Sequence, residues 1–192
     1  MALRSQLIHR GYIDGATALG QAESNIQPQS SFLKGGLKFE VASELSQIMQ
    51  LRSLAQEALA ESRFRGATFS LEKFTKAAER ATADISRHGV LIASRSDSPV
   101  GFAYCNIGNP MVGIGLLITT VQVLYVSPKI RATLLGGKVA NGLLNGVLSW
   151  NKVRQGKEVL VHLTSGIKSA ETHLLLKKRG FETIGGGYAK KL

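Results

Sequence analysis

Apolar positions follow two different spacings along the chain. The segment LKFEVA at residues 37–42 has apolar side chains at every second position, which predicts a short strand. Over residues 45–59 apolar side chains return every three or four positions, which predicts one helix of about twenty residues. Ser70 precedes a second stretch of this kind at residues 71–81, and serine is a favoured helix N-cap. The folded part of the chain is therefore expected to open with a strand and two helices.

The spacing changes after residue 88, where buried strands are expected. Three strands are expected first: VLIAS (90–94), VGFAYCNIG (100–108) and LLITTVQVLYV (116–126). A helix at 137–153 follows, and then a fourth strand, EVLVHLT (158–164). The chain is expected to end with a helix at 165–180 and a last strand or hairpin at 181–192. Gly180 stands at the C′ position of the last helix, where glycine is common. This order predicts one α/β domain over residues 37–192.

Residues 1–36 are polar and contain little periodicity, so we expect an arm outside the core. Such an arm would serve as an assembly contact in a homo-oligomer or a larger assembly. The N-terminus lacks a continuous apolar stretch, so no secretory signal is expected.

Apolar and cysteine content exclude several classes of protein. No run of about 18 apolar residues occurs, so no membrane span is expected. Cys105 is the only cysteine, which excludes an intrachain disulfide and favours a reducing, cytoplasmic setting. Cys105 lies in an apolar run, where a buried side chain is more common than a nucleophile. The four histidines show no metal-ligand spacing, so no metal site is expected.

The net charge of +11 is concentrated near the C-terminus. Residues 129–192 contain twelve Lys and Arg against three Glu, whereas residues 1–128 contain twelve against ten acids. A solvated basic face is the simplest explanation. A more specific explanation is that this segment binds a polyanionic partner, which would be the phosphates of a nucleotide cofactor, a nucleic acid or an acidic protein.

Four stretches in this order carry a family resemblance: LKFEVA with the later ESRFRGATFSLEKF, then SPVGFAY, then VLYVSPKIR, and finally HLLLKKRGFETIGGGYAKKL. Together they resemble the GNAT acetyltransferase superfamily, in the short form common in bacteria and bacteriophages, over about 155 residues. The resemblance implies a mixed α/β (α+β) fold, with a mostly antiparallel sheet flanked by about four helices. It also implies acetyl-CoA as co-substrate and an amine as acceptor.

In that family the cofactor lies along a splayed strand, with its pyrophosphate on the loop that enters the next helix. The resemblance implies that Leu124 and Val126 form the strand edge here, and that Lys129, Arg131 and Lys138 add positive charge. A helix N-terminus suits an anion because its N–H groups are free and its dipole is positive there.

The loop itself departs from the family pattern Arg/Gln-x-x-Gly-x-Gly/Ala. Counted directly from Arg131, the expected glycines fall on Leu134 and Gly136, so the first is lost. A start four residues later aligns LGGKVA with the pattern instead and implies a lengthened loop. This second alignment, which we prefer from sequence, makes the cofactor-binding residues Gly136, Gly137, Lys138, Val139 and Ala140.

The catalytic residues are less clear from the sequence. The cofactor strand has Thr119, Thr120 and Gln122 where relatives often have a carboxylate, and Leu176 stands where they have a tyrosine acid. The substitutes are His162 on the neighbouring strand and Tyr188 near the C-terminus, with a backbone N–H near Val126 as oxyanion donor. Glu61 and Ser62 match the motif beside the acceptor site. For each of these residues a packing or solvated role is a competing expectation.

Two hypotheses follow. The first is an N-acetyltransferase that transfers acetyl directly from acetyl-CoA to an amine. The alternative is a catalytically inactive GNAT-fold assembly protein, such as a bacteriophage virion component, that uses residues 1–36 to bind its neighbours. Nucleic-acid binding is less favoured, because the basic segment lacks interleaved aromatic residues.

Overall fold

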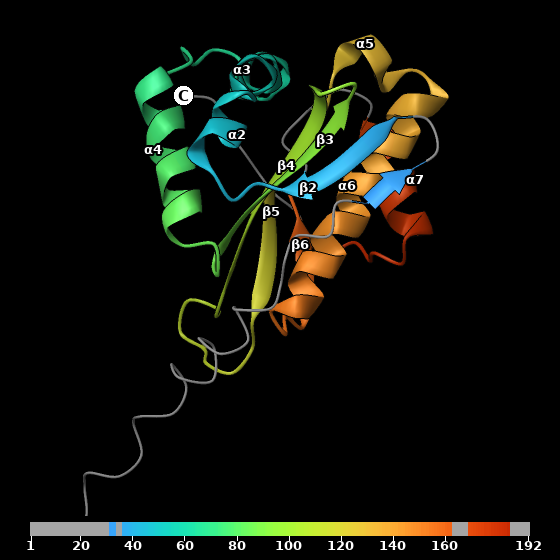
Figure 1. Cartoon of the computed structure of the whole chain (residues 1–192). Coiled ribbons are helices and arrows are strands. Elements are labelled where there is room, and N and C mark those ends of the chain that lie inside the picture. Colours follow the sequence, from blue (N-terminus) through green and yellow to red (C-terminus); the bar gives the residue numbers. More distant parts are fainter. Residues whose placement is uncertain (1–30, 34–35, 163–168, 185–192) are drawn as a thin grey trace, which may run out of the picture. The chain divides into compact units, whose positions relative to one another are not determined.

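The structure is a computed structural model that describes residues 31–33, 36–162 and 169–184 (Figure 1). Its elements, in chain order, are β1 (Ser31–Leu33), β2 (Leu37–Val41), α2 (Leu45–Met49), α3 (Arg52–Glu61), α4 (Leu71–Ala83), β3 (His88–Arg95), β4 (Ser98–Gly108), β5 (Ile118–Val126), α5 (Pro128–Arg131), α6 (Leu134–Val153), β6 (Glu158–Val161) and α7 (Ser169–Lys178). Residues 31–192 form one compact unit, and residues 1–30, most of the expected arm, lie outside the described residues.

The six strands form a single sheet in sequence order, β1-β2-β3-β4-β5-β6. All neighbouring pairs are antiparallel except β5 and β6, which are parallel. The expectation of a mixed, mostly antiparallel sheet is therefore confirmed. The folded unit starts earlier than expected, however, because residues 31–33 pair with β2, where Leu33 lies opposite Leu37. Gly36, at φ +72°, provides the positive-φ backbone of the intervening turn.

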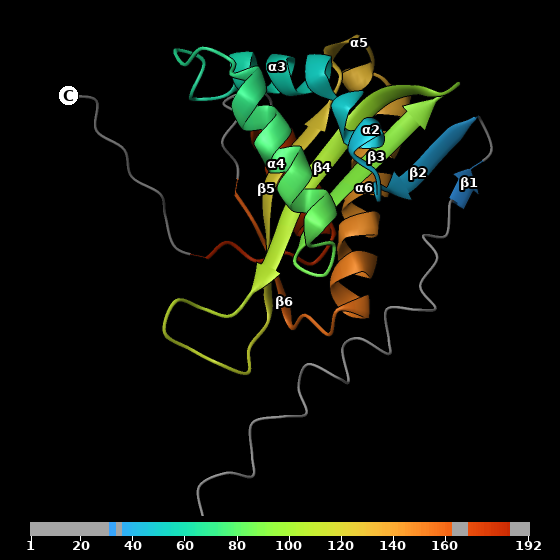
Figure 2. The same ribbon diagram turned by 60° about the vertical axis from the view of Figure 1, so that its left-hand side comes forward.

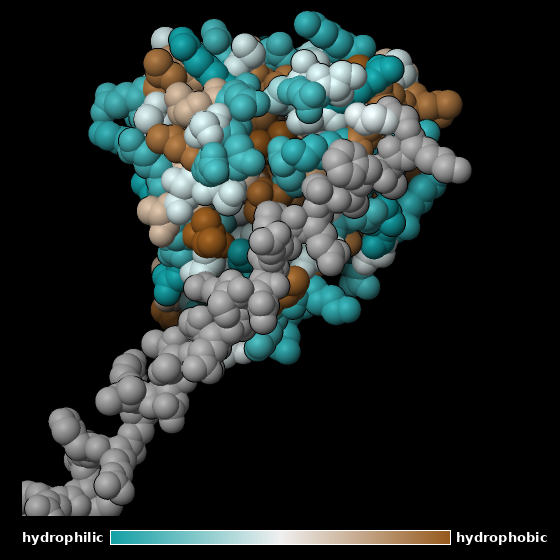
Figure 3. All heavy atoms as spheres, viewed as in Figure 1, coloured by the Kyte–Doolittle hydropathy of each residue, from teal (hydrophilic) through white to brown (hydrophobic). Residues whose placement is uncertain are grey.

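The sheet is covered by helices on both faces (Figures 1 and 2). One face carries α2, α3 and α4, and the other carries α6. The α7 end is joined to α6 by Arg179, which donates to the side-chain oxygens of Asn141 (2.9 Å) and Asn145 (2.8 Å). Hydrophilic side chains cover most of the described surface in the view of Figure 3, as expected for a core between sheet and helices.

Local signals explain several helix ends. The Ser70 hydroxyl accepts the Lys73 N–H (3.2 Å), so the expected N-cap of α4 is confirmed. Gly180 has φ +80° and its N–H donates to the Lys177 carbonyl (3.0 Å), which confirms the expected C′ glycine of α7. The expectation of one long first helix was wrong, because a tight turn at Leu51 divides this segment into α2 and α3. The Leu51 side chain is 1% exposed.

The remaining expectations concern the C-terminus and bound metals. Residues 181–184, the described start of the expected last strand, form no strand, and residues 185–192 lie outside the described residues. Within the described ranges no helix has the length and apolarity needed to cross a bilayer. No three His, Cys, Asp or Glu side chains there gather as a metal site.

Candidate functional site

The described pairing of β5 with β6 covers only the first part of β5. It runs from Ile118 with Glu158 to Val121 with Val161. The His162 N–H donates to the Val121 carbonyl at 3.4 Å, and β5 extends further, to Val126. Among the described residues, the rest of this β5 edge has no strand partner.

A β-bulge in β5 lies where the described pairing with β6 ends. Tyr104 is opposite Val123 and Cys105 is opposite Val121, so Gln122 is an extra residue in β5. Bulges bend a strand and redirect a side chain. The Gln122 side chain donates to the Asn106 side-chain oxygen (3.0 Å), on the face that carries α2–α4.

The hydrogen bonds beyond β5 fix which backbone groups face the open edge. The Ser127 N–H donates to the Val100 carbonyl in β4 (2.9 Å). Because strand residues alternate in direction, Val126 and Leu124 direct their backbone groups to the opposite, open edge. The two residues expected at the strand edge thus lie along it, and their side chains pack in the core beside α6.

Only Ala132 and Thr133 separate α5 from α6, so the loop is not lengthened. The Thr133 hydroxyl accepts the Gly136 N–H (3.3 Å) and caps α6. A Cβ at Gly136 would lie 2.7 Å from the Arg131 Cα, so this glycine allows α6 to pack on α5. The assignment of residues 136–140 to cofactor binding stays a prediction, with these residues placed in a helix rather than in a loop.

Residues 136–140 consequently lie inside the first two turns of α6 rather than in a loop. The Gly137 N–H donates to the Thr133 carbonyl (3.2 Å), and the Val139 side chain is fully buried in the core. The free N–H groups at the start of α6 are those of Leu134 and Leu135, the first two residues of the helix. The Leu134 side chain is 89% exposed at this end.

The other expected cationic residues differ in their surroundings. The Arg131 guanidinium donates to Glu61 Oε2 (2.6 Å) and, through two nitrogens, to the Val126 carbonyl (3.0 and 2.8 Å). It also lies over the Tyr125 ring, 5.0 Å from the centroid. Arg131 and Glu61 thus join α3 to the end of β5, whereas Lys129 and Lys138 are exposed near the start of α6.

A pocket of about 580 Å³ lies between α2–α4 and the sheet. Gln122, Val123 and His162 line it, just beyond the last described β5–β6 pair, Val121 with Val161. Of the two expected acceptor residues, Ser62 lines the pocket, but Glu61 does not. The lining residues are Ile48, Leu51, Ala55, Ala58, Leu59, Ser62, Phe64, Phe74, Ala77, Ala78, Val90, Phe102, Tyr104, Gln122, Val123 and His162.

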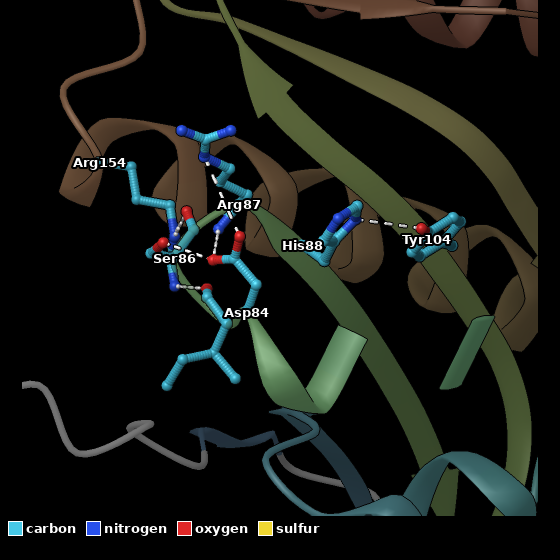
Figure 4. A network of polar contacts seen from close by, with 7 residues as sticks. Asp84, Ser86, Arg87, His88, Tyr104 and Arg154 are labelled. Atoms are coloured by element: carbon cyan, nitrogen blue, oxygen red, sulfur yellow. Dashed lines mark hydrogen bonds and ion pairs between the residues drawn. The ribbon is translucent and has the colours of Figure 1, made fainter. Parts of the chain in front are cut away.

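A histidine–tyrosine pair at the pocket was not anticipated from sequence. The Tyr104 hydroxyl lies 3.1 Å from His88 Nδ1, and the two rings are stacked with an interplanar angle of 8° (Figure 4). Burial lowers the pKa of His88, against the opposing charge of Asp84, so a neutral imidazole is favoured. Burial also raises the pKa of Tyr104. Tyr104 lines the pocket and connects it to the neutral His88 ring by this contact.

The other candidates have different outcomes. The Cys105 side chain is fully buried, and burial raises its pKa to about 12, which confirms a core residue. Leu176 is also buried, so an apolar contact stands where relatives are expected to have a tyrosine. Tyr188 lies outside the described residues, and its role stays a prediction.

Sequence comparisons find no relatives: no protein-family model and no curated protein match the chain. Solved structures do match. A predicted acetyltransferase from Clostridium acetobutylicum, with acetyl-CoA, has a TM-score of 0.62 at 15% identity, covering 81% of this chain and 96% of that one. Ribosomal-protein-alanine N-acetyltransferase from Brucella melitensis has a TM-score of 0.59 at 16% identity, covering 82% and 99%. AAC(6')-Iy, in complex with a bisubstrate analogue, has a TM-score of 0.62 at 14% identity, covering 81% and 99%. The chain has the fold of the GNAT acetyltransferases.

Proposed function

Because the chain has the GNAT fold, we propose that it is an N-acetyltransferase that transfers acetyl directly from acetyl-CoA to an amine. The observation that carries the proposal is the Gln122 bulge of β5, which lies where the described β5–β6 pairing ends and beside a pocket. This arrangement offers one ligand an open strand edge and another a cavity that meets the same point. The acetyl-CoA named for the Clostridium acetobutylicum structure supports the choice of donor.

The described residues fit such a donor in three respects. The backbone of Leu124 and the Val126 N–H can hydrogen-bond an extended amide chain, whereas the Val126 carbonyl already accepts from Arg131. The N–H groups of Leu134 and Leu135 can receive phosphate at the positive end of α6. A Cβ at Gly137 would meet no atom within 4 Å, so there is room for an anion beside the helix start.

When bound, acetyl-CoA supplies an activated thioester for attack by the amine. A backbone N–H of the open edge, at Leu124 or Val126, can stabilise negative charge on the carbonyl oxygen. His162 and the Tyr104–His88 pair both reach the pocket and are the candidates to accept the proton that the amine loses. Tyr188 stays a candidate to return a proton to the thiolate.

Titration calorimetry of the full chain with acetyl-CoA tests the proposal. Leu134→Glu adds negative charge where the phosphates would lie, and we expect it to weaken binding at least tenfold. The same change is favourable for the helix dipole by about 0.3–1 kcal/mol, so lost binding would not reflect unfolding. Leu134→Gln is the uncharged control and should bind within about threefold of the wild type. Absence of binding to the wild type at millimolar ligand would contradict the proposal.

The assembly alternative is not proposed. It depends on residues 1–36, most of which lie outside the described residues, and no contact in the described ranges favours it.

A further inference from the structure

The pocket has a lining that discriminates between classes of amine. Twelve of its sixteen lining residues are apolar, and the four polar ones are Ser62, Tyr104, Gln122 and His162. Among the described residues no Asp, Glu, Lys or Arg lines it. A volume of about 580 Å³ is within the range of roughly 300–1,000 Å³ typical of small-molecule sites.

The polar groups of the pocket are mostly engaged already. The Ser62 hydroxyl donates to the Leu59 carbonyl (2.8 Å) and accepts the Phe64 N–H (3.0 Å). The Gln122 amide nitrogen donates to Asn106, and the Tyr104 hydroxyl bonds His88. Within the described lining, a ligand therefore meets free polar atoms near Gln122 and His162 and mainly apolar surface elsewhere.

The two acids at the C-terminal half of α3 are Glu57 and Glu61, and neither lines the pocket. Glu61 is paired with Arg131 at 2.6 Å, and Glu57 Oε2 is buried without a hydrogen-bond partner in the described part of the chain. At the mouth, Phe64 is 54% exposed and the Arg63 guanidinium lies 5.5 Å from its ring centroid. A ligand with several positive charges would meet a cation at the entrance and no carboxylate inside. Burial of unpaired charge is costly, so this site disfavours polycations.

Resting on the proposed acetyl transfer, we infer that the acceptor is a primary amine on an uncharged apolar body, such as an arylalkylamine. Its body would lie against α2–α4 and its nitrogen near Gln122 and His162. Desolvation in this pocket favours the neutral amine over the ammonium ion, which supplies the nucleophile without a carboxylate base.

The transfer balances as follows. The neutral amine nitrogen donates its lone pair to the thioester carbonyl carbon and forms the C–N bond. The C–S bond breaks and its electron pair leaves with the sulfur of coenzyme A. The nitrogen loses one proton, which His162 or the Tyr104–His88 pair accepts, and one proton is returned to the sulfur. The products are the N-acetyl amine and coenzyme A thiol.

The test uses the full chain and two probes, 2-phenylethylamine and spermidine, titrated separately by calorimetry, with acetyl-CoA titrated in parallel. We expect 2-phenylethylamine to bind at least tenfold more tightly than spermidine. Spermidine binding that is equal or tighter would overturn the inference. If acetyl-CoA binds and 2-phenylethylamine does not, the acceptor inference alone fails. If 2-phenylethylamine binds and acetyl-CoA does not, the proposed function fails instead.

Two substitutions on α3 locate the binding. Ala58 lines the pocket, whereas Ala60 is exposed on the same helix. We expect Ala58→Glu to weaken 2-phenylethylamine binding at least tenfold and Ala60→Glu to change it less than twofold. Ala58→Leu fills the pocket without charge, and it should also weaken the ligand if Ala58→Glu fails to fold. Unchanged binding in a folded Ala58 variant would overturn the inference.

Discussion

The two faces of the sheet are packed to different degrees. On the α6 face, Val139, Leu143, Leu144 and Val147 are all fully buried and form a closed core. On the other face, α2–α4 leave a pocket of about 580 Å³ that reaches Gln122 and His162. The difference indicates that the α6 face is the more closely packed and that the other face has room for a ligand, since closely packed cores leave few voids larger than a water molecule.

The largest difference between the two faces is expected in the rate at which a cysteine on each face reacts with a thiol reagent. Cys105 belongs to the α6-side core and has a pKa raised to about 12 by burial. We expect native Cys105 to react with an aromatic disulfide reagent at pH 8 at least about 100-fold more slowly than a cysteine introduced by Ala58→Cys in a Cys105→Ala background. Equal rates in the two native proteins would contradict the closed-core assignment.

Truncation of a leucine on each face compares their contributions to stability. Leu143 is fully buried on α6, whereas Leu59 is partly exposed in the pocket wall. Leu143→Ala should lower the free energy of unfolding by about 2–5 kcal/mol, and Leu59→Ala by about 1 kcal/mol, because the pocket already exposes that side chain. Urea denaturation measures both. A larger loss from Leu59→Ala would reverse the comparison.

Catalytic effects should appear only on the open face. His162→Ala and Tyr104→Phe should each lower kcat for acetyl transfer by roughly tenfold to a hundredfold, about 1.4–2.7 kcal/mol of activation free energy. His173→Ala, on exposed α7 surface, is the matched control and should leave kcat within twofold. If both pocket variants behave like this control, neither group accepts the proton.

The smallest effect concerns pH and His88. Its pKa is lowered in the folded state by burial, so the unfolded chain binds more protons between the folded pKa and about 6.5. Stability should therefore fall as pH is lowered through that window. The pKa of Asp84 is also lowered, mainly by its hydrogen bond with Ser86. Its contribution to folding stability is therefore lost only below about pH 4, outside the pH window used for His88. We expect His88→Gln to reduce the loss of urea midpoint between pH 7.5 and 5; an undiminished loss would assign it to other groups.

Local sequence signals were sufficient for most of the fold. Strand spacing, the Ser70 cap and the Gly180 terminus are encoded by neighbouring residues, and the structure confirms them. The break at Leu51 was missed because both halves keep helical spacing, and only burial of Leu51 against the sheet favours the turn. Pairing of residues 31–33 was missed because so short a strand has no recognisable period.

The site was less predictable because it depends on register. The Gln122 bulge and the His88–Tyr104 contact arise from strand pairing between residues sixteen or more apart, which single-sequence spacing does not reveal. The start of α6 is marked by the Thr133 cap and by the close approach of Gly136 to Arg131. A threonine three residues before the glycine was a signal that could have identified this helix start.

The most direct test of the proposed activity is a product assay. The full chain is incubated with acetyl-CoA and 2-phenylethylamine, and free thiol and N-acetyl product are measured together by a colorimetric reagent and mass spectrometry. We expect the two to form in equal amounts at a rate that depends on the protein. Absence of product from this amine and from a panel of other primary amines, in protein that binds acetyl-CoA, would contradict acetyl transfer.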